Sequence, residues 1–123
     1  MTLTIHLPWP DSKLSPNSRA HWRPVAKAKA RAKSDAYYAT RAALQVQAVE
    51  GWQPSAVALH WTLFPPDRHV RDDDNVVAAL KAARDGIFLA LGVDDSVVRV
   101  TDSEWEEVRK GGAVVASLDE MRE

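Results

Sequence analysis

Apolar and polar residues alternate in two short stretches of the chain. Residues 3–7 carry an apolar side chain at every second position and stop at Pro8, and residues 57–63 repeat the pattern shortly before a pair of prolines. A two-residue period is typical of strands with one buried face. Proline ends such strands because it cannot donate a hydrogen bond to the ladder. We predict a strand over each stretch.

Apolar and small side chains recur every three or four residues in two longer stretches. The first covers residues 24–49 and has Pro24 where proline favours a first helical turn. The second begins at an acidic run near Asp72 and closes at Gly92, a residue suited to a helix C-cap. Its apolar stripe, which must face a core, consists of Val76, Leu80, Ala83, Ile87 and Leu91. We predict two helices, the first preceded by a polar loop over residues 11–21.

Two further strands are predicted near the carboxyl end. Residues 97–108 and 112–118 read as strands, and the intervening Lys110, Gly111 and Gly112 are typical of a hairpin turn. The element order is therefore strand, helix, strand, helix, strand, strand. This order favours a single α+β domain over residues 1–123, with two helices packed on one face of a mixed sheet.

Composition excludes several classes of protein. The chain has no cysteine, so disulfides, thiolate catalysis and cysteine-rich zinc sites are excluded. It also lacks an apolar run long enough to cross a membrane and a signal-like amino terminus. We therefore expect a cytoplasmic protein without a membrane partner, in which any metal ion is held by oxygen atoms, with or without histidine.

Charge is divided between the two parts of the chain. Residues 1–50 carry 8 Lys and Arg against 3 acids, whereas residues 51–123 carry 8 against 14. The division suits a nucleic-acid enzyme that binds phosphate with one surface and metal with another. A cationic stripe on the first helix, flanked by Lys29 and Lys33, is formed by Arg23, Lys27, Arg31 and Arg41. An ordinary solvated helix face is the alternative interpretation of this stripe.

Acidic residues are concentrated at the start of the second helix and just beyond its end. Asp72, Asp73 and Asp74 are consecutive, and Asp94 and Asp95 form a second pair. Adjacent carboxylates repel one another, and a divalent cation turns that repulsion into binding energy. Hard oxygen ligands are those that Mg²⁺ and Mn²⁺ prefer. The alternative is that the aspartates only cap the helix.

Lys81 is the basic residue between the two acidic groups. On a continuous helix it shares a stripe with Asp74 and Asp85, because residues four, seven and eleven apart lie on one face. A lysine near carboxylates and a metal ion would stabilise negative charge in phosphoryl chemistry. The alternative is a solvated lysine that pairs with Asp85.

Four segments of the chain resemble the RusA-type endodeoxyribonucleases, which are Holliday-junction resolvases common in phages and prophages. The segments are Leu7-Pro8-Trp9-Pro10, Arg71-Asp72-Asp73-Asp74-Asn75, Gly92-Val93-Asp94-Asp95 and Lys110-Gly111-Gly112. The resemblance covers nearly the whole chain. It implies a phage or prophage protein that acts in the cytoplasm of a bacterial host.

The resemblance also implies a homodimer that binds branched DNA and hydrolyses phosphodiesters with Mg²⁺, or Mn²⁺ as a substitute, and with no small-molecule cofactor. It implies that the catalytic residues are Asp72, Asp74, Asp95 and Lys81, and that the metal ligands are Asp72, Asp74, Asp95 and Asp94. The family lysine commonly falls three residues after the motif's asparagine, where this chain has Ala78; Lys81 lies one turn further on. The residues expected to bind DNA are Asn17, Arg19, Arg23, Lys27, Arg31 and Arg71.

Two other functions are compatible with the sequence. One is a catalytically weak protein that binds branched DNA on the same fold, which the displaced lysine favours. The other is a small acidic module that binds a metal or a partner and has no role with nucleic acid.

Overall fold

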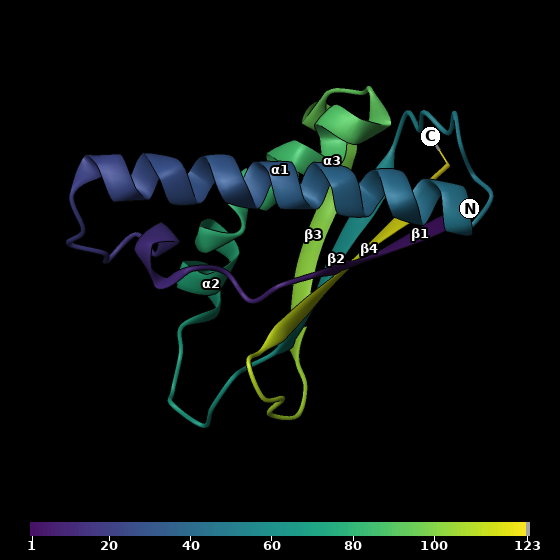
Figure 1. Ribbon diagram of the computed structural model, residues 1–123. Helices are drawn as coiled ribbons and strands as arrows, with labels where there is room; N and C mark the ends of the chain where they lie inside the picture. Colours follow the sequence, from purple (N-terminus) through teal and green to yellow (C-terminus); the bar gives the residue numbers. More distant parts are fainter. Residues whose placement is uncertain (123) are drawn as a thin grey trace.

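The computed structural model describes residues 1–122. Within these residues there are three α-helices, two short 3₁₀ helices and four strands (Figure 1). In chain order the elements are β1 (Thr2–Leu7), η1 (Ser12–Leu14), α1 (Trp22–Val46), β2 (Val57–Phe64), α2 (Asp73–Ala79), α3 (Lys81–Leu91), η2 (Asp95–Val97), β3 (Val98–Trp105) and β4 (Ala113–Glu120). The predicted single α+β domain is confirmed.

The four strands form one mixed sheet in the order β1-β4-β2-β3. β4 is antiparallel to both β1 and β2, whereas β2 and β3 are parallel. Parallel neighbours need a crossover connection, and α2 and α3 supply it between β2 and β3. The predicted mixed sheet is therefore confirmed.

The predicted hairpin between the last two strands is wrong. β2 lies between β3 and β4, so that Leu63 pairs with Trp105 on one side and with Val114 on the other. Gly111 and Gly112 do have positive φ angles and reverse the chain. Turn residues indicate that the chain reverses, but they do not determine whether the strands on either side of the turn pair with each other.

The predicted second helix is two helices that meet at Leu80. The Leu80 N–H bonds to the carbonyl of Val77, three residues back, which is the tighter 3₁₀ pattern. Leu80 itself is buried. The predicted apolar stripe from Val76 to Leu91 is confirmed, since all five of its residues are buried.

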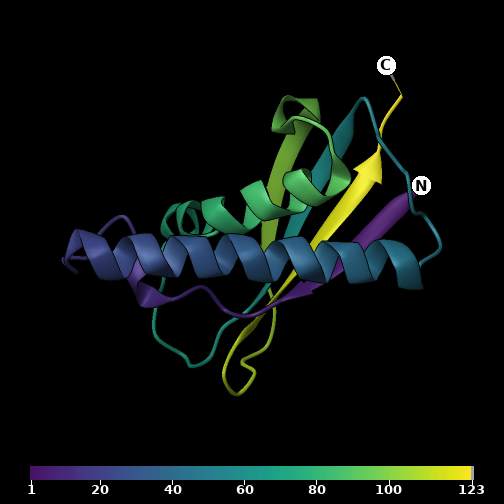
Figure 2. The ribbon, with the colours of Figure 1, turned by 45° about the horizontal axis from the view of Figure 1, so that its top comes forward.

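The helices lie against one face of the sheet (Figures 1 and 2). The core between the layers contains the inward side chains of the strands, among them Ile5, Leu59 and Trp61, together with Ile87 of α3. α1 and α3 approach closely, because a Cβ added at Gly86 would lie 2.2 Å from the carbonyl oxygen of Lys33. No helix in the described part of the chain is long and apolar enough to cross a membrane.

α1 extends well beyond the sheet at its amino-terminal end, as both ribbon views show (Figures 1 and 2). The buried residues of this helix are Ala36, Thr40 and Leu44, all in its carboxyl-terminal part. The first turns of α1 therefore contribute no buried residue to the core and form a projecting arm.

Candidate functional site

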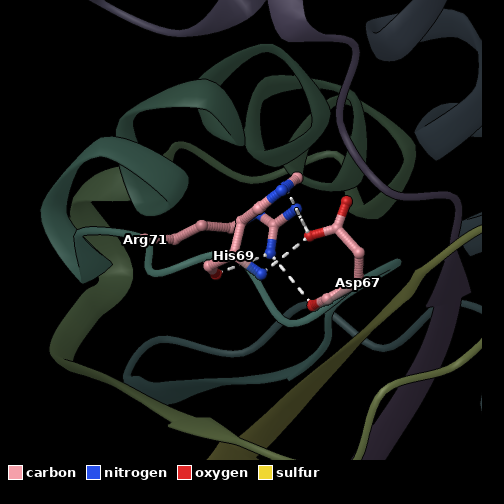
Figure 3. A network of polar contacts seen from close by, with 3 residues as sticks. All are labelled: Asp67, His69 and Arg71. Carbon is pink, nitrogen blue, oxygen red and sulfur yellow. Dashed lines mark hydrogen bonds and ion pairs between the residues drawn. The ribbon is translucent and has the colours of Figure 1, made fainter.

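A polar network shapes the loop that leads from β2 into Arg71-Asp72-Asp73-Asp74-Asn75, which we call the acidic motif (Figure 3). Arg71 donates from Nη2 to the Asp67 carboxylate at 2.6 Å, and from Nη1 to the carbonyl oxygens of His69 at 3.0 Å and Asp67 at 3.2 Å. The Asp67 carboxylate also accepts from the His69 backbone N–H at 3.0 Å. That bond and the Arg71 guanidinium lower the pKa of Asp67. Arg71 thus holds the loop in place.

Three of the four segments that resemble RusA proteins meet at this end of the molecule. The rings of Trp9 and Trp105 lie 6.2 Å apart, and the Arg71 guanidinium lies 5.5 Å from the Trp9 ring. Gly112 fits against the same indole, because a Cβ added to it would approach the Trp9 Cβ to 2.7 Å. The first segment, the acidic motif and the glycine turn therefore pack around Trp9.

The three consecutive aspartates have three different environments. Asp72 caps α2, its Oδ1 accepting from the Asp74 N–H at 2.8 Å. Asp73 accepts a hydrogen bond from the indole N–H of Trp105 at the end of β3. Asp74 is exposed, and within residues 1–122 its carboxylate has neither a hydrogen bond nor an ion pair. The capping interpretation is confirmed for Asp72, while Asp74 keeps its oxygens available.

A groove lies beside these carboxylates. It has a volume of about 490 Å³ and is lined by Trp9, Ser12, Arg71, Asp72 and Asn75, among others. Its size is within the range of ligand-binding clefts. Carboxylate and amide oxygens from one helix end therefore face a space that could admit a hydrated cation or a phosphate group.

The second acidic pair lies at the opposite end of the helices (Figure 1). Asp94 caps η2 by accepting from the Ser96 N–H at 3.0 Å, and its pKa is lowered by the hydrogen bonds from the Ser96 side chain and backbone. Asp95 lies 3.9 Å from Nε of Arg84. The eleven residues of α3 alone separate the pairs by about 16 Å, at 1.5 Å per residue.

One described chain therefore does not assemble all the predicted metal ligands. Among residues 1–122, no group of three or more histidines, aspartates or glutamates could hold a metal ion together. Asp72 and Asp74 lie on one helix end, and Asp94 and Asp95 lie on another. The predicted metal site remains a prediction.

Lys81 lies away from the acidic motif and contacts Asp85. Its Nζ is 3.7 Å from Asp85 Oδ2, and its side chain is 79% exposed. The break at Leu80 interrupts the continuous stripe on which the sequence analysis placed Lys81 with Asp74. Lys81 instead lines a groove between α1 and α3 with Lys29 and Lys33. We call these three lysines and the cleft between them the lysine groove.

The residues expected to bind DNA are exposed apart from Arg71. Arg23 and Lys27 lie on the projecting arm of α1, and Asn17 and Arg19 lie in the preceding loop. Arg31 is also exposed and lies 3.9 Å from Asp35 in the next turn. Their exposure agrees with the prediction but does not test binding.

Several residues of these surfaces escaped the sequence analysis. Trp105 anchors Asp73, Asp67 orients Arg71, and Arg84 faces Asp95. Each of these contacts joins elements or turns whose proximity depends on the loop path and strand order. Only the Asp67–Arg71 contact could have been expected from the sequence, because these two residues are four positions apart.

A histidine on the opposite, uncovered face of the sheet has two acidic partners. His60 Nδ1 lies 2.5 Å from Asp102, and Nε2 lies 3.0 Å from Glu104. Hydrogen bonds to Glu104 and Asp102 raise the pKa of His60. The parallel pairing of β2 with β3 creates this cluster, which links the edge strand to the centre of the sheet.

The fold and these surfaces define a small α+β domain with a groove beside Asp72 and Asn75 at one end and a cationic helical arm. No protein-family model matches the chain. The chain is 36% identical over 121 residues to an uncharacterized protein from Xylella fastidiosa (strain Temecula1 / ATCC 700964), covering 94% of this chain and 74% of that protein. The chain belongs to the family of this Xylella protein.

Proposed function

We propose that the protein is a metal-dependent endonuclease of the RusA type, which resolves Holliday junctions and other branched DNA in recombination and repair. The observation that carries the proposal is the packing of three resemblance segments around Trp9, beside the exposed carboxylates of α2. Two of these segments, through Trp9 and Arg71, also line the groove beside Asp72, and Gly112 packs against the Trp9 side chain.

The oxygens on α2 fit a hard divalent cation. Asp72 and Asp74 lie two residues apart, and Asp72 and Asn75 line the groove. Bound Mg²⁺ or Mn²⁺ would neutralise phosphate charge and make an attacking water more acidic. The role of this chain is to hold the carboxylates at a fixed helix end, which the Trp105 bond to Asp73 and the Arg71 network keep in position.

A site that uses Asp95 as well requires two copies of the chain. Asp95 lies beyond the far end of α3 from Asp72 and Asp74. A two-fold dimer would bring the η2 end of one copy to the α2 end of the other, and would do so twice by symmetry. Two equivalent sites on opposing strands match the approximate two-fold symmetry of a four-way junction. Paired nicks would follow.

Binding to the DNA backbone is assigned to the cationic surfaces of α1 and α3. The arm presents Arg23 and Lys27, and the lysine groove adds Lys29, Lys33 and Lys81. Such contacts to phosphate are independent of sequence and weaken with salt. Lys81 would stabilise the negative charge of a phosphate from this groove.

The test is incubation with a labelled four-way junction and a matched linear duplex, with Mg²⁺, Mn²⁺ or chelator. We expect paired, metal-dependent nicks in the junction and none in the duplex. Asp74→Asn should reduce cleavage at least 100-fold and preserve junction binding, because it removes a ligand charge without altering the fold. Glu50→Gln, which makes the same chemical change at an exposed residue near the end of α1, should cleave normally. Equal cleavage by Asp74→Asn and wild type would contradict the assignment.

A catalytically weak protein that binds branched DNA is the second candidate. The specific observation in its favour is that Ala78 occupies the usual lysine position while Lys81 pairs with Asp85. Tight junction binding with no nicks under either metal would support it. Absence of any salt-dependent DNA binding would instead favour an acidic module that binds a metal or a partner.

A further inference from the structure

Trp22 is a large apolar side chain left outside the core. It is the first residue of α1 and is 66% exposed. The neighbouring turns of the arm bury no residue, and the ribbon views show that this end of α1 extends past the sheet (Figures 1 and 2). Burying an aromatic side chain stabilises a fold, and this exposed indole does not contribute in that way.

The Trp22 ring is held by its neighbours in sequence. The His21 ring lies 5.6 Å from it at 33°, and the Arg23 guanidinium lies 5.3 Å from its centroid. His21 also caps the helix, its Nδ1 accepting from the Arg23 N–H at 3.3 Å. These contacts restrict the indole and still leave most of it exposed, which lowers the entropic cost of contact with a partner.

The charges around Trp22 select the class of partner. Arg19, Arg23 and Lys27 are all exposed near this end of α1, and Asn17 precedes them. The first turn of the helix contains no acidic residue. A flat aromatic ring among cations is complementary to a nucleobase with its flanking phosphates, through base stacking and charge.

We infer that Trp22 is a stacking platform for an exposed base at the branch point of DNA, with Arg19, Arg23 and Lys27 binding the flanking phosphates. The inference rests on the proposed function and deepens it. Continuous duplex offers stacked bases whose faces are already covered, whereas a branch point offers the faces of terminal or unpaired bases. Trp22 would therefore contribute selectivity for branched over linear DNA, and the lysine groove would contribute affinity for both.

The test is a four-way junction with 2-aminopurine at the branch point, titrated in chelator so that no cleavage occurs. Stacking on Trp22 should change the probe fluorescence for wild type and for Trp22→Phe, but not for Trp22→Ala. Base stacking of about 1–3 kcal/mol corresponds to roughly 5- to 150-fold in affinity, so Trp22→Ala should weaken junction binding at least fivefold. Its affinity for linear duplex should be unchanged.

Tyr38→Ala is the matched control, because Tyr38 is 68% exposed on the same helix but lies outside the arm's cationic end. It should retain the fluorescence change and the junction affinity. The inference is overturned if Trp22→Ala behaves as wild type, or if it loses junction and duplex affinity equally.

Two outcomes separate this inference from the proposed function. If wild type binds and nicks junctions but Trp22→Ala is unaltered in binding, the inference fails and the nuclease proposal stands. If wild type shows the Trp22-dependent change without nicking under any metal, the stacking site stands and the nuclease proposal fails. Wild type that binds no DNA overturns both.

Discussion

The three aspartates of the acidic motif have different roles, although they are the same type of residue. Asp72 caps a helix, Asp73 accepts a hydrogen bond from Trp105, and the Asp74 carboxylate makes no hydrogen bond or ion pair with residues 1–122. Sequence reasoning identified the cluster because three adjacent carboxylates are unfavourable without compensation. It could not assign a different role to each aspartate, because Trp105, which donates a hydrogen bond to Asp73, lies on a strand 32 residues away.

His60 gives a pH-dependent contribution to stability that can be tested at the residue scale. Its folded-state pKa is raised above the ordinary value of 6.5 by Glu104 and Asp102. Because the folded protein binds this proton more tightly, the stabilisation is complete below about pH 6.5 and is lost as the pH rises through the raised pKa. Urea unfolding between about pH 5.5 and 8.5 should show wild type losing stability in this interval relative to His60→Gln.

The comparison with His60→Gln cancels the titration of the other histidines, which are common to both proteins. A difference in unfolding free energy that stays constant across the interval would contradict the described His60 cluster.

At the scale of elements, the sequence predicted what depends on local periodicity. The strands that became β1 and β2, the long α1 and the buried stripe from Val76 to Leu91 along α2 and α3 were all expected from the spacing of apolar residues. The break at Leu80 was missed because no glycine or proline marks it. The position of β3 beside β2 was missed because its mostly exposed residues carry no signal for a neighbour.

The contact between α1 and α3 makes a sharp prediction for Gly86→Ala. Helix propensity alone would make this change stabilising by about 1 kcal/mol. The added Cβ, however, would lie 2.2 Å from the Lys33 carbonyl oxygen, and backbone cannot move aside easily. Overpacking of this kind costs about 1–3 kcal/mol or more, so we expect a net loss of stability.

Equilibrium urea unfolding measures this difference as a lower midpoint at an unchanged slope. Ala90→Gly, at a half-buried position of the same helix, is a control for propensity and should cost about 1 kcal/mol. A Gly86→Ala protein more stable than wild type would show that the helices are further apart than described.

At the scale of the whole molecule, the acidic motif and the cationic arm lie on different helices, α2 and α1. The groove lined by Asp72 and Asn75 lies beside α2, whereas α1 carries the cationic arm and most of the lysine groove, and Ala79 lines both grooves. The sequence places the two acidic groups at the start of the predicted second helix and just beyond its end, and the structure keeps them at opposite ends of α2 and α3. The sequence alone did not show that this length of helix keeps Asp95 out of reach of Asp72 and Asp74 within one chain.

The lysine groove can be tested through the salt dependence of DNA binding. Each lost phosphate contact should lower the slope of log K against log salt by about 0.9. Replacing Lys29 and Lys33 together with alanine should therefore reduce the slope by up to about 2, measured by fluorescence anisotropy on duplex DNA. Lys13→Ala is the control, because Lys13 pairs with Asp11 at 3.6 Å. An unchanged slope in the double variant would remove the groove from the DNA-binding surface.

The most direct test of the account is complementation between two inactive variants on the four-way junction with Mg²⁺. Asp74→Asn and Asp95→Asn should each be inactive alone. In a mixed dimer formed by co-expression, one site receives both substitutions and the other receives neither, so the mixture should nick a single strand. Wild type should make paired nicks. A wild-type protein that cleaves while the mixture stays inactive would contradict a site shared between two chains, and a wild type that makes no metal-dependent nick would contradict the nuclease itself.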